Sequence, residues 1–323
     1  MNCFRGNQYL RIMQCVATVA IGTTAWCAQA APPPRGAWLQ TPFGELEIFP
    51  AANPWNQDIS RLPVHPLSKT YLAAIGLDKP LHPDFGTVWN GAPSGIPFIV
   101  VPPGQKRVAV EFEYADESDP GPYPIPDDAP IEGGPRGRGD RHVLVVDYEQ
   151  KKLYELFNAT PLGGRWKASS GAVFDLTSNA LRPAGWTSAD AAGLPVFAGL
   201  ARYDEVVERG EIRHALRFTV RTTQRGYLAP ATHFASRSTD RSLPPMGLRV
   251  RLRGDFDESK FPASAQVILR GLKKYGMFLA DNGGDWFVSG APHPGWNDDE
   301  LHTLKRVRGA DFEAVATGEL ITR

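Results

Sequence analysis

Short stretches in which apolar and polar residues alternate recur along most of the chain. Between residues 107 and 114, for example, Val108, Val110 and Phe112 occupy every second position, and most of the residues between and beside them are charged. This period of two, with turn residues between the stretches, is typical of strands in antiparallel sheets. Strands are therefore expected at residues 96–101, 107–114, 142–146, 152–157, 170–176, 212–221, 247–253, 277–280 and 286–289.

Helical periodicity is confined to a few short segments. Residues 263–275 carry apolar residues at helical spacing and end before a glycine, and residues 68–75 and 298–307 are shorter candidates. The 29 prolines and 32 glycines of the chain favour turns over long helices. The sequence thus predicts a mainly β fold, an antiparallel β-sandwich or jelly-roll-like domain with a few peripheral helices.

One connection carries a specific turn signal. Asn282 and Gly283 lie between two expected strands, and an Asn-Gly pair suits the positive φ angles of a tight hairpin turn. We therefore expect residues 277–280 and 286–289 to pair directly with each other.

The first 30 residues have the layout of a secretory signal peptide. Arg5 and Arg11 precede an apolar stretch at residues 12–26, and Ala28-Gln29-Ala30 forms an A-x-A cleavage site. The apolar stretch is too short for a membrane span. Cleavage after Ala30 would give a secreted or periplasmic protein with no integral membrane segment in its mature chain.

Cysteine content and charge narrow the classes of function. Cys3, Cys15 and Cys27 all lie in the expected signal peptide, so the mature chain has no disulfide and no thiol nucleophile. The 35 basic and 35 acidic residues balance to a formal net charge of zero. Such a balance argues against nucleic acid or an anionic membrane as the partner.

The chain divides into a short spacer and one long domain. Residues 31–42 are Pro-rich and are expected to be extended, and residues 43–323 are expected to form a single β-rich domain. Within it, residues 115–140 hold six prolines and five glycines. This stretch is either a mobile surface loop or a wall of a binding cleft that presents Tyr123. Its acidic residues give a weak signal for calcium.

Several runs of sequence together resemble a known family. They are YADESDPGPYPIP (114–126), GDRHVLVVD (139–147), HALRFTV (214–220), PPMGLRVRL (244–252) and WFVSGAP (286–292), with others between them. The set resembles a family of uncharacterised secreted bacterial proteins that sometimes occur beside carbohydrate-binding modules, over roughly residues 46–315. The resemblance implies export and a polysaccharide context, and it implies no particular reaction.

Histidines are the first candidates for chemistry, because G-x-S-x-G, H-E-x-x-H and P-loop motifs are absent from the sequence. His142 and His214 each share a strand face with apolar residues, and His233 lies in the same half of the chain. Each is interpreted either as a hydrogen-bonded core histidine or as a catalytic acid or base. No cofactor is indicated, although the three histidines together would suit a divalent metal.

The second candidate region is the polar segment from residue 175 to residue 205. Asp175 and Asp204 are candidate catalytic carboxylates, and the candidate substrate-binding residues are Asn179, Arg182, Trp186, Asp190, Arg202 and Tyr203. The alternative is structural, with helix caps near Asp190 and a salt bridge between Arg202 and Asp204. Arg217 is expected on a solvated strand face. Trp55, Trp89 and Trp296 are either loop anchors or sugar platforms.

These patterns lead to three hypotheses. The first is a secreted protein that acts on a polysaccharide or oligosaccharide, as a glycoside hydrolase or a polysaccharide lyase. The alternative is a non-catalytic glycan-binding or envelope structural protein, and the second alternative is a histidine-ligated metal enzyme. Whether the protein is an enzyme stays open at this level.

Overall fold

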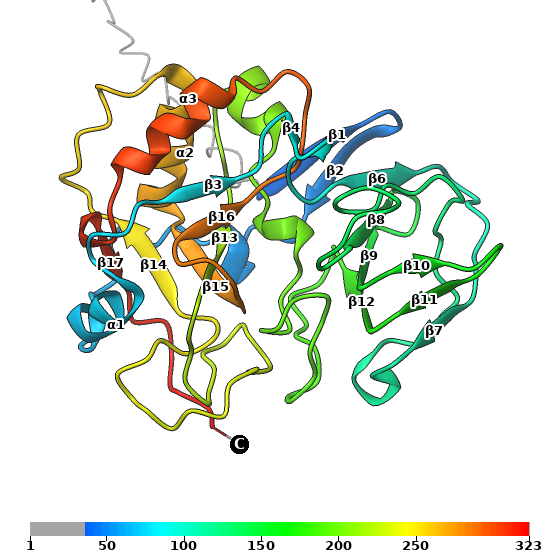
Figure 1. Ribbon diagram of the computed structural model, residues 1–323, viewed down its shortest axis with the longest axis horizontal. Coiled ribbons are helices and arrows are strands. Elements are labelled where there is room, and N and C mark those ends of the chain that lie inside the picture. Colours follow the sequence, from blue (N-terminus) through cyan, green and yellow to red (C-terminus); the bar gives the residue numbers. More distant parts are fainter. Residues whose placement is uncertain (1–35, 323) are drawn as a thin grey trace, which may run out of the picture. The chain divides into compact units, whose positions relative to one another are not determined.

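The computed structural model describes residues 36–322, which belong to one compact unit (Figure 1). The expected signal peptide and residues 31–35 of the expected spacer lie outside the described residues. The rest of that spacer is folded, because Ala37–Thr41 is strand β1 and pairs with β2, Gly44–Ile48. Ala37 and Leu39 are buried in the main core, so the folded unit begins before residue 43.

The expectation of a mainly β fold with few helices is confirmed. A six-stranded sheet has the order β17 (Phe312–Ala314), β14 (Arg249–Leu252), β15 (Met277–Asn282), β13 (Leu216–Val220), β16 (Phe287–Ser289) and β3 (His82–Asp84). A four-stranded sheet has the order β12 (Ser170–Asp175), β9 (Lys152–Phe157), β8 (Val143–Asp147) and β6 (Phe98–Val101). Smaller sheets comprise β10 (Thr160–Pro161), β11 (Trp166–Ala168) and β7 (Val110–Phe112), and β4 (Val88–Trp89) with β5 (Ala92–Pro93).

The predicted hairpin between β15 and β16 is wrong. In the six-stranded sheet β13 lies between these two strands, parallel to β15 and antiparallel to β16. The turn after β15 passes over the end of β13, where the Gly283 amide donates to the Val220 carbonyl at 2.9 Å. The Asn-Gly signal marked a turn correctly, but it carries no information on which strand fills the space between the strands it joins.

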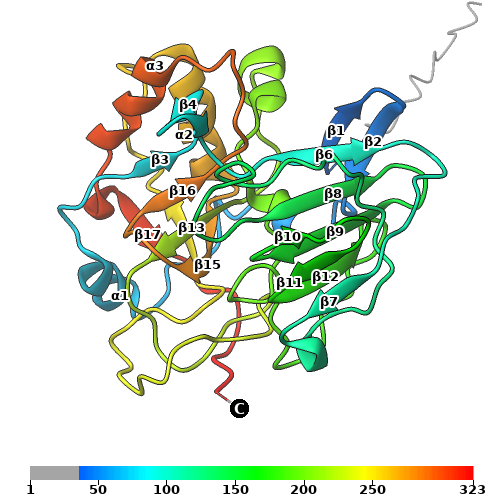
Figure 2. The same cartoon turned by 45° about the vertical axis from the view of Figure 1, so that its right-hand side comes forward.

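The helices are α1 (Ser68–Ile75), α2 (Ala263–Lys274) and α3 (Asp298–His302). In α2 the apolar residues at helical spacing, Ala265, Ile268 and Leu272, are buried in the main core. Figures 1 and 2 show α2 and α3 together at one side of the six-stranded sheet. Among residues 36–322, no helix has the length and apolar character needed to cross a membrane.

The four-stranded sheet is covered on both faces. Leu144 and Val146 of β8 belong to the main core, whereas Val143 and Val145 belong to a second apolar cluster. Residues from the irregular stretch 115–140 close this second cluster, and Tyr123 is its centre with 0% exposure. The stretch is therefore neither a free surface loop nor a cleft wall that presents Tyr123. It covers one face of the sheet, which explains why β8 is apolar at each position from Val143 to Val146.

Candidate functional site

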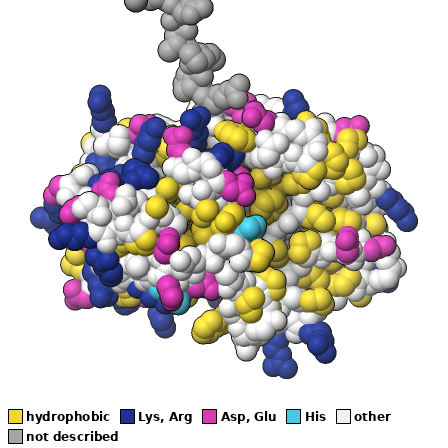
Figure 3. Space-filling view, turned by 90° about the horizontal axis from the view of Figure 1, so that it is seen from above, with side chains coloured by type: hydrophobic (Ala, Val, Ile, Leu, Met, Phe, Trp, Pro, Cys, Tyr) yellow, Lys and Arg dark blue, Asp and Glu magenta, His cyan; other side chains and the backbone are white. Residues whose placement is uncertain are grey.

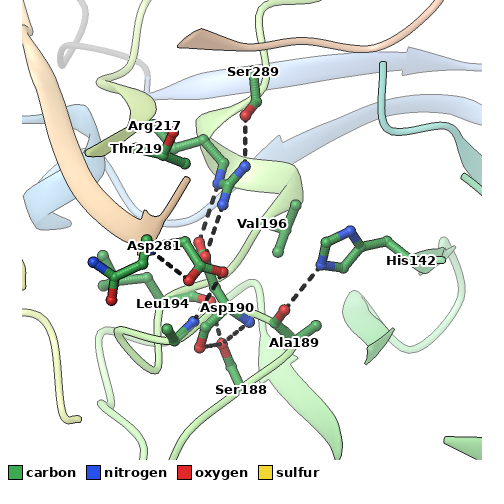
Figure 4. Close-up of polar contacts among 12 residues, drawn as sticks. His142, Ser188, Ala189, Asp190, Leu194, Val196, Arg217, Thr219, Asp281 and Ser289 are labelled. Atoms are coloured by element: carbon green, nitrogen blue, oxygen red, sulfur yellow. Dashed lines mark hydrogen bonds and ion pairs between the residues drawn. The ribbon is translucent and has the colours of Figure 1, made fainter. Parts of the chain in front are cut away.

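A buried ion pair lies where the six-stranded sheet meets the segment that follows β12 (Figure 4). Arg217 of β13 donates from Nε and Nη2 to the two carboxylate oxygens of Asp190, at 3.1 and 2.7 Å. Its third nitrogen, Nη1, donates to the Ser289 hydroxyl of β16 at 2.5 Å. Asp190 is 1% exposed and Arg217 is 4% exposed. The two-pronged contact fixes both side chains in orientation as well as in distance.

Arg217 was expected on a solvated strand face, but its side chain is buried. Leu216 and Phe218 of β13 point into the main core, and Arg217 points to the opposite face. That face is also buried, because the segment containing Asp190 packs over it. Alternation along a strand separates the two faces, but it does not show whether a second layer of chain covers the polar one.

A second carboxyl group lies beside Asp190. Asp281 is partly exposed near the end of β15, and its side chain is hydrogen-bonded to that of Asp190. Its oxygens also accept from the backbone amides of Asn282, at 2.7 Å, and Ala191, at 3.4 Å. Burial, together with the charge of Asp190, raises the pKa of Asp281 to about 8, although Arg217 acts in the opposite direction. Asp281 therefore carries a proton at neutral pH.

Sequence reasoning missed Asp281, because the residue was assigned to a turn. Its signal is a carboxylate directly after the buried run Met277–Ala280. Its neighbour Asp190 was among the candidate residues, but as a substrate-binding group. Their proximity could not be predicted, because it depends on the parallel pairing of β13 with β15, which places Thr219 opposite Asp281.

Two of the candidate histidines hold the backbone on either side of Asp190. His142 Nε2 lies 3.0 Å from the Ala189 carbonyl, and His233 Nδ1 lies 2.7 Å from the Ala191 carbonyl. His142 also contacts the Glu132 carboxylate through Nδ1 at 2.6 Å. Burial opposes protonation of His142, but Glu132 outweighs it and raises the histidine pKa to about 9. At neutral pH His142 thus donates from both nitrogens, which makes it a positioning residue.

Arg182 and Trp186 support the same segment. The buried Arg182 donates to the Thr187 carbonyl at 2.7 Å and to the Glu117 carbonyl at 2.9 Å, and it forms an ion pair with Asp119. Its guanidinium lies 5.5 Å from the centre of the partly exposed Trp186 ring. The stretch 115–140, through these contacts and through Glu132, therefore anchors the turn that carries Asp190.

A separate group forms around His214. His214 Nε2 lies 3.0 Å from Glu205, and Glu205 pairs with Arg202 at 2.7 Å. Arg202 also pairs with Asp204 at 3.1 Å, as the salt-bridge alternative predicts. Arg202 further donates to the Trp38 carbonyl of β1 at 3.0 Å, so this group fastens the β1–β2 hairpin.

The other candidates of the polar segment have partners outside the carboxyl pair. Tyr203 stacks on His293 with ring centres 3.9 Å apart. Asp175 is exposed and accepts from the amide and hydroxyl of Thr177 at 2.9 and 2.7 Å, and the Asn179 side chain accepts from Asn53 at 3.0 Å. Within the described residues, none of the three side chains is hydrogen-bonded to Asp190 or Asp281. These three candidates therefore lie outside the carboxyl pair.

A histidine-ligated metal is the other chemistry that the sequence suggests. In the part of the chain that the structure describes, no group of three or more His, Cys, Asp and Glu side chains is arranged to hold a metal ion. Both ring nitrogens of His142 and of His214 already have protein partners.

Comparison of the chain with models of protein families, with curated proteins and with solved structures finds no match.

Proposed function

We propose that the protein is an exported glycoside hydrolase and that Asp281 is its general acid. The observation that carries the proposal is the hydrogen-bonded pair of Asp190 and Asp281, of which Asp281 is partly exposed and protonated at neutral pH. Two carboxyl groups in contact do not both ionise, so their pair retains a proton that a substrate can take.

Cleavage of a glycosidic bond uses such a proton directly. Asp281 would transfer it to the oxygen that leaves, while the bond from that oxygen to the anomeric carbon breaks. Water supplies the new bond to the anomeric carbon, and the proton that this water loses restores Asp281. An acid with a pKa near the working pH is both sufficiently protonated and sufficiently ready to release its proton.

Asp190 and Arg217 act in this proposal as positioning residues. Arg217 holds the Asp190 carboxylate in one orientation, and the negative charge of Asp190 disfavours ionisation of Asp281. The bonds of His142 and His233 to the flanking carbonyls keep the turn at Asp190 in place. The site would therefore be assembled before substrate arrives, which reduces the reorganisation that the reaction requires.

Hydrolysis fits this arrangement better than the lyase reaction. A lyase needs a free base for the C5 proton and a cation beside the uronate carboxylate. Arg217 has all of its nitrogens bonded to Asp190 and Ser289, and His142 is protonated at neutral pH. The pair of Asp190 and Asp281 offers a protonated carboxyl group, and the charge of the buried Arg217 is already neutralised by Asp190.

The proposal is tested with the purified mature protein and the Asp281→Asn variant on neutral and uronate polysaccharides. New reducing ends without absorbance from an unsaturated product are expected, and Asp281→Asn should lower the rate roughly 10²–10⁴-fold. Asp257→Asn is the matched control, because Asp257 is an exposed carboxylate that caps the amide of Ser259 at 3.0 Å. It should cleave at the wild-type rate.

Three results would contradict the proposal. One is the absence of product from every polymer, and another is an unsaturated product. The third is cleavage by Asp281→Asn at the wild-type rate, which would place the acid elsewhere.

A further inference from the structure

A cavity of about 580 Å³ opens beside β3 and the β4–β5 hairpin, and its lining residues do not include Asp190 or Asp281. Its lining combines aromatic, acidic and basic side chains, among them His82, Asp84, Trp89, Phe287 and Lys305. His82 and Phe287 stack with ring centres 3.9 Å apart. A pocket with apolar walls and a few polar groups is a usual form of ligand site.

Trp89 is the most exposed of the large hydrophobic residues in the described chain, at 76%. It lies on a short hairpin, in which Asn90 and Gly91 form the turn with φ angles of 50° and 80°. At the base of the hairpin, the Thr87 amide donates to Asp298 at 3.0 Å, and the Thr87 hydroxyl bonds to the same carboxylate. Two-residue Asn-Gly turns with positive φ suit tight hairpins, so the indole is presented by an ordered element.

Trp89 differs in exposure from Trp55 and Trp296, although the sequence gives all three the same two interpretations. Trp55 and Trp296 are 3% and 5% exposed and pack in the main core, as loop anchors do. An exposed indole that lines a cavity lacks this explanation. Its flat apolar face suits the C–H face of a pyranose ring, and the neighbouring polar groups suit the hydroxyls of that ring.

The polar groups at the cavity are open to a ligand. Asp84 is exposed and Lys305 is partly exposed at the cavity, and within residues 36–322 neither side chain forms a hydrogen bond or ion pair with another residue. Seen from above, the molecule carries hydrophobic side chains across the middle of that face, and Lys and Arg gather toward its left-hand side (Figure 3).

The cavity adjoins the carboxyl pair through neighbouring strands. Asp84 of β3 lies opposite Ser289 of β16 in parallel register, and residues paired in this way point to the same face. Ser289 accepts the bond from Arg217, which holds Asp190. A row of side chains thus leads from Asp84 across β16 and β13 to the proposed acid–base centre.

We propose that this cavity is a glycan subsite, in which Trp89 stacks on one pyranose ring and Asp84 and Lys305 bond its hydroxyls. The inference rests on the proposed function only in that it names where a further part of the same chain substrate is held. It predicts that Trp89 contributes to binding and not to the chemical step.

The test measures binding apart from turnover. Asp281→Asn protein, with and without Trp89→Ala, is titrated calorimetrically with cello-, xylo-, chito- and galacturonan oligosaccharides. Trp89→Ala should weaken binding at least about 10-fold, which corresponds to about 1.4 kcal/mol. Trp89→Phe should fall between the two. Tyr114→Ala is the matched control, because Tyr114 is another exposed aromatic residue and does not line the cavity.

Equal affinity with and without Trp89→Ala overturns the subsite, and so does the absence of binding to every oligosaccharide. A melting temperature unchanged by Trp89→Ala excludes misfolding as the cause of a loss. Failure of the two proposals can be told apart. Trp89-dependent binding without cleavage by the wild type keeps the subsite and removes the hydrolase, whereas cleavage with an unchanged KM in Trp89→Ala does the reverse.

Discussion

Three aspartates of this protein show how surroundings decide the chemistry of one residue type. Asp175 is exposed and its hydrogen bonds to Thr177 lower its pKa, so it is ionised. Asp190 is paired with Arg217, and Asp281, in contact with Asp190, keeps its proton. Sequence analysis nominated Asp175 and Asp190 from composition and position. It could not rank them or find Asp281, because burial and cross-strand neighbours produce the difference.

The protonation of Asp281 predicts a pH dependence of stability. The folded protein keeps this proton up to about pH 8, whereas the unfolded chain loses it near the ordinary value of 3.8. The bound proton of Asp281 therefore contributes fully to the free energy of unfolding below the unfolded pKa of 3.8, and this contribution is lost as pH rises through about 8. The difference in unfolding free energy between wild type and Asp281→Asn, from urea titrations, should decline over this window. A difference that stays constant with pH would contradict the assignment.

Among the structural elements, strand β13 and the turn at Asp190 stabilise each other through the contact of Arg217 with Asp190. The polar face of β13 is buried only because that turn packs on it, and the turn is fixed by Arg217 from one side and by His142 and His233 from the other. Strand positions were predictable from alternation, and β9 and α1 have the predicted bounds. The contact between the turn at Asp190 and the sheet was not predictable, because it joins residues that are distant in sequence.

Removal of the Arg217 charge should destabilise this contact strongly. Arg217→Met leaves the buried Asp190 carboxylate without its partner, and the expected loss is about 3–5 kcal/mol in a denaturant titration. Adding Asp190→Asn should recover part of the loss, because the unpaired charge is then removed. Arg253→Met, which breaks an exposed pair with Asp255, is the control and should leave the midpoint nearly unchanged. A similar small effect of Arg217→Met would show that the pair is not buried in solution.

The two apolar clusters are connected through one sheet at the scale of the whole molecule. Strands β8 and β9 contribute to both clusters, on opposite faces. Composition and periodicity were sufficient to predict a β-rich protein with few helices. They did not reveal that residues 115–140 fold over the sheet, because this stretch is ordered by what it covers and has no regular structure of its own.

Because β8 and β9 contribute to both apolar clusters, we expect the two clusters to unfold together. Tyr123→Ala removes the central ring of the second cluster, and a loss of about 3–5 kcal/mol is expected for an aromatic residue at such a site. Because the sheet is common, the calorimetric melt should move to lower temperature as a single transition. Two resolved transitions in the variant would mean that residues 115–140 and the sheet they cover form an independent unit.

The most direct test of the central claim is an NMR titration of the aspartate side-chain carboxyl carbons in the mature protein. Comparison with Asp281→Asn assigns the resonance of Asp281 without any knowledge of the substrate. We predict that this resonance titrates near pH 8, as expected for a carboxyl group that shares its proton with Asp190. A titration of the Asp281 resonance near its ordinary pKa of 3.8 would show an ionised carboxylate at neutral pH and would contradict the proposed acid.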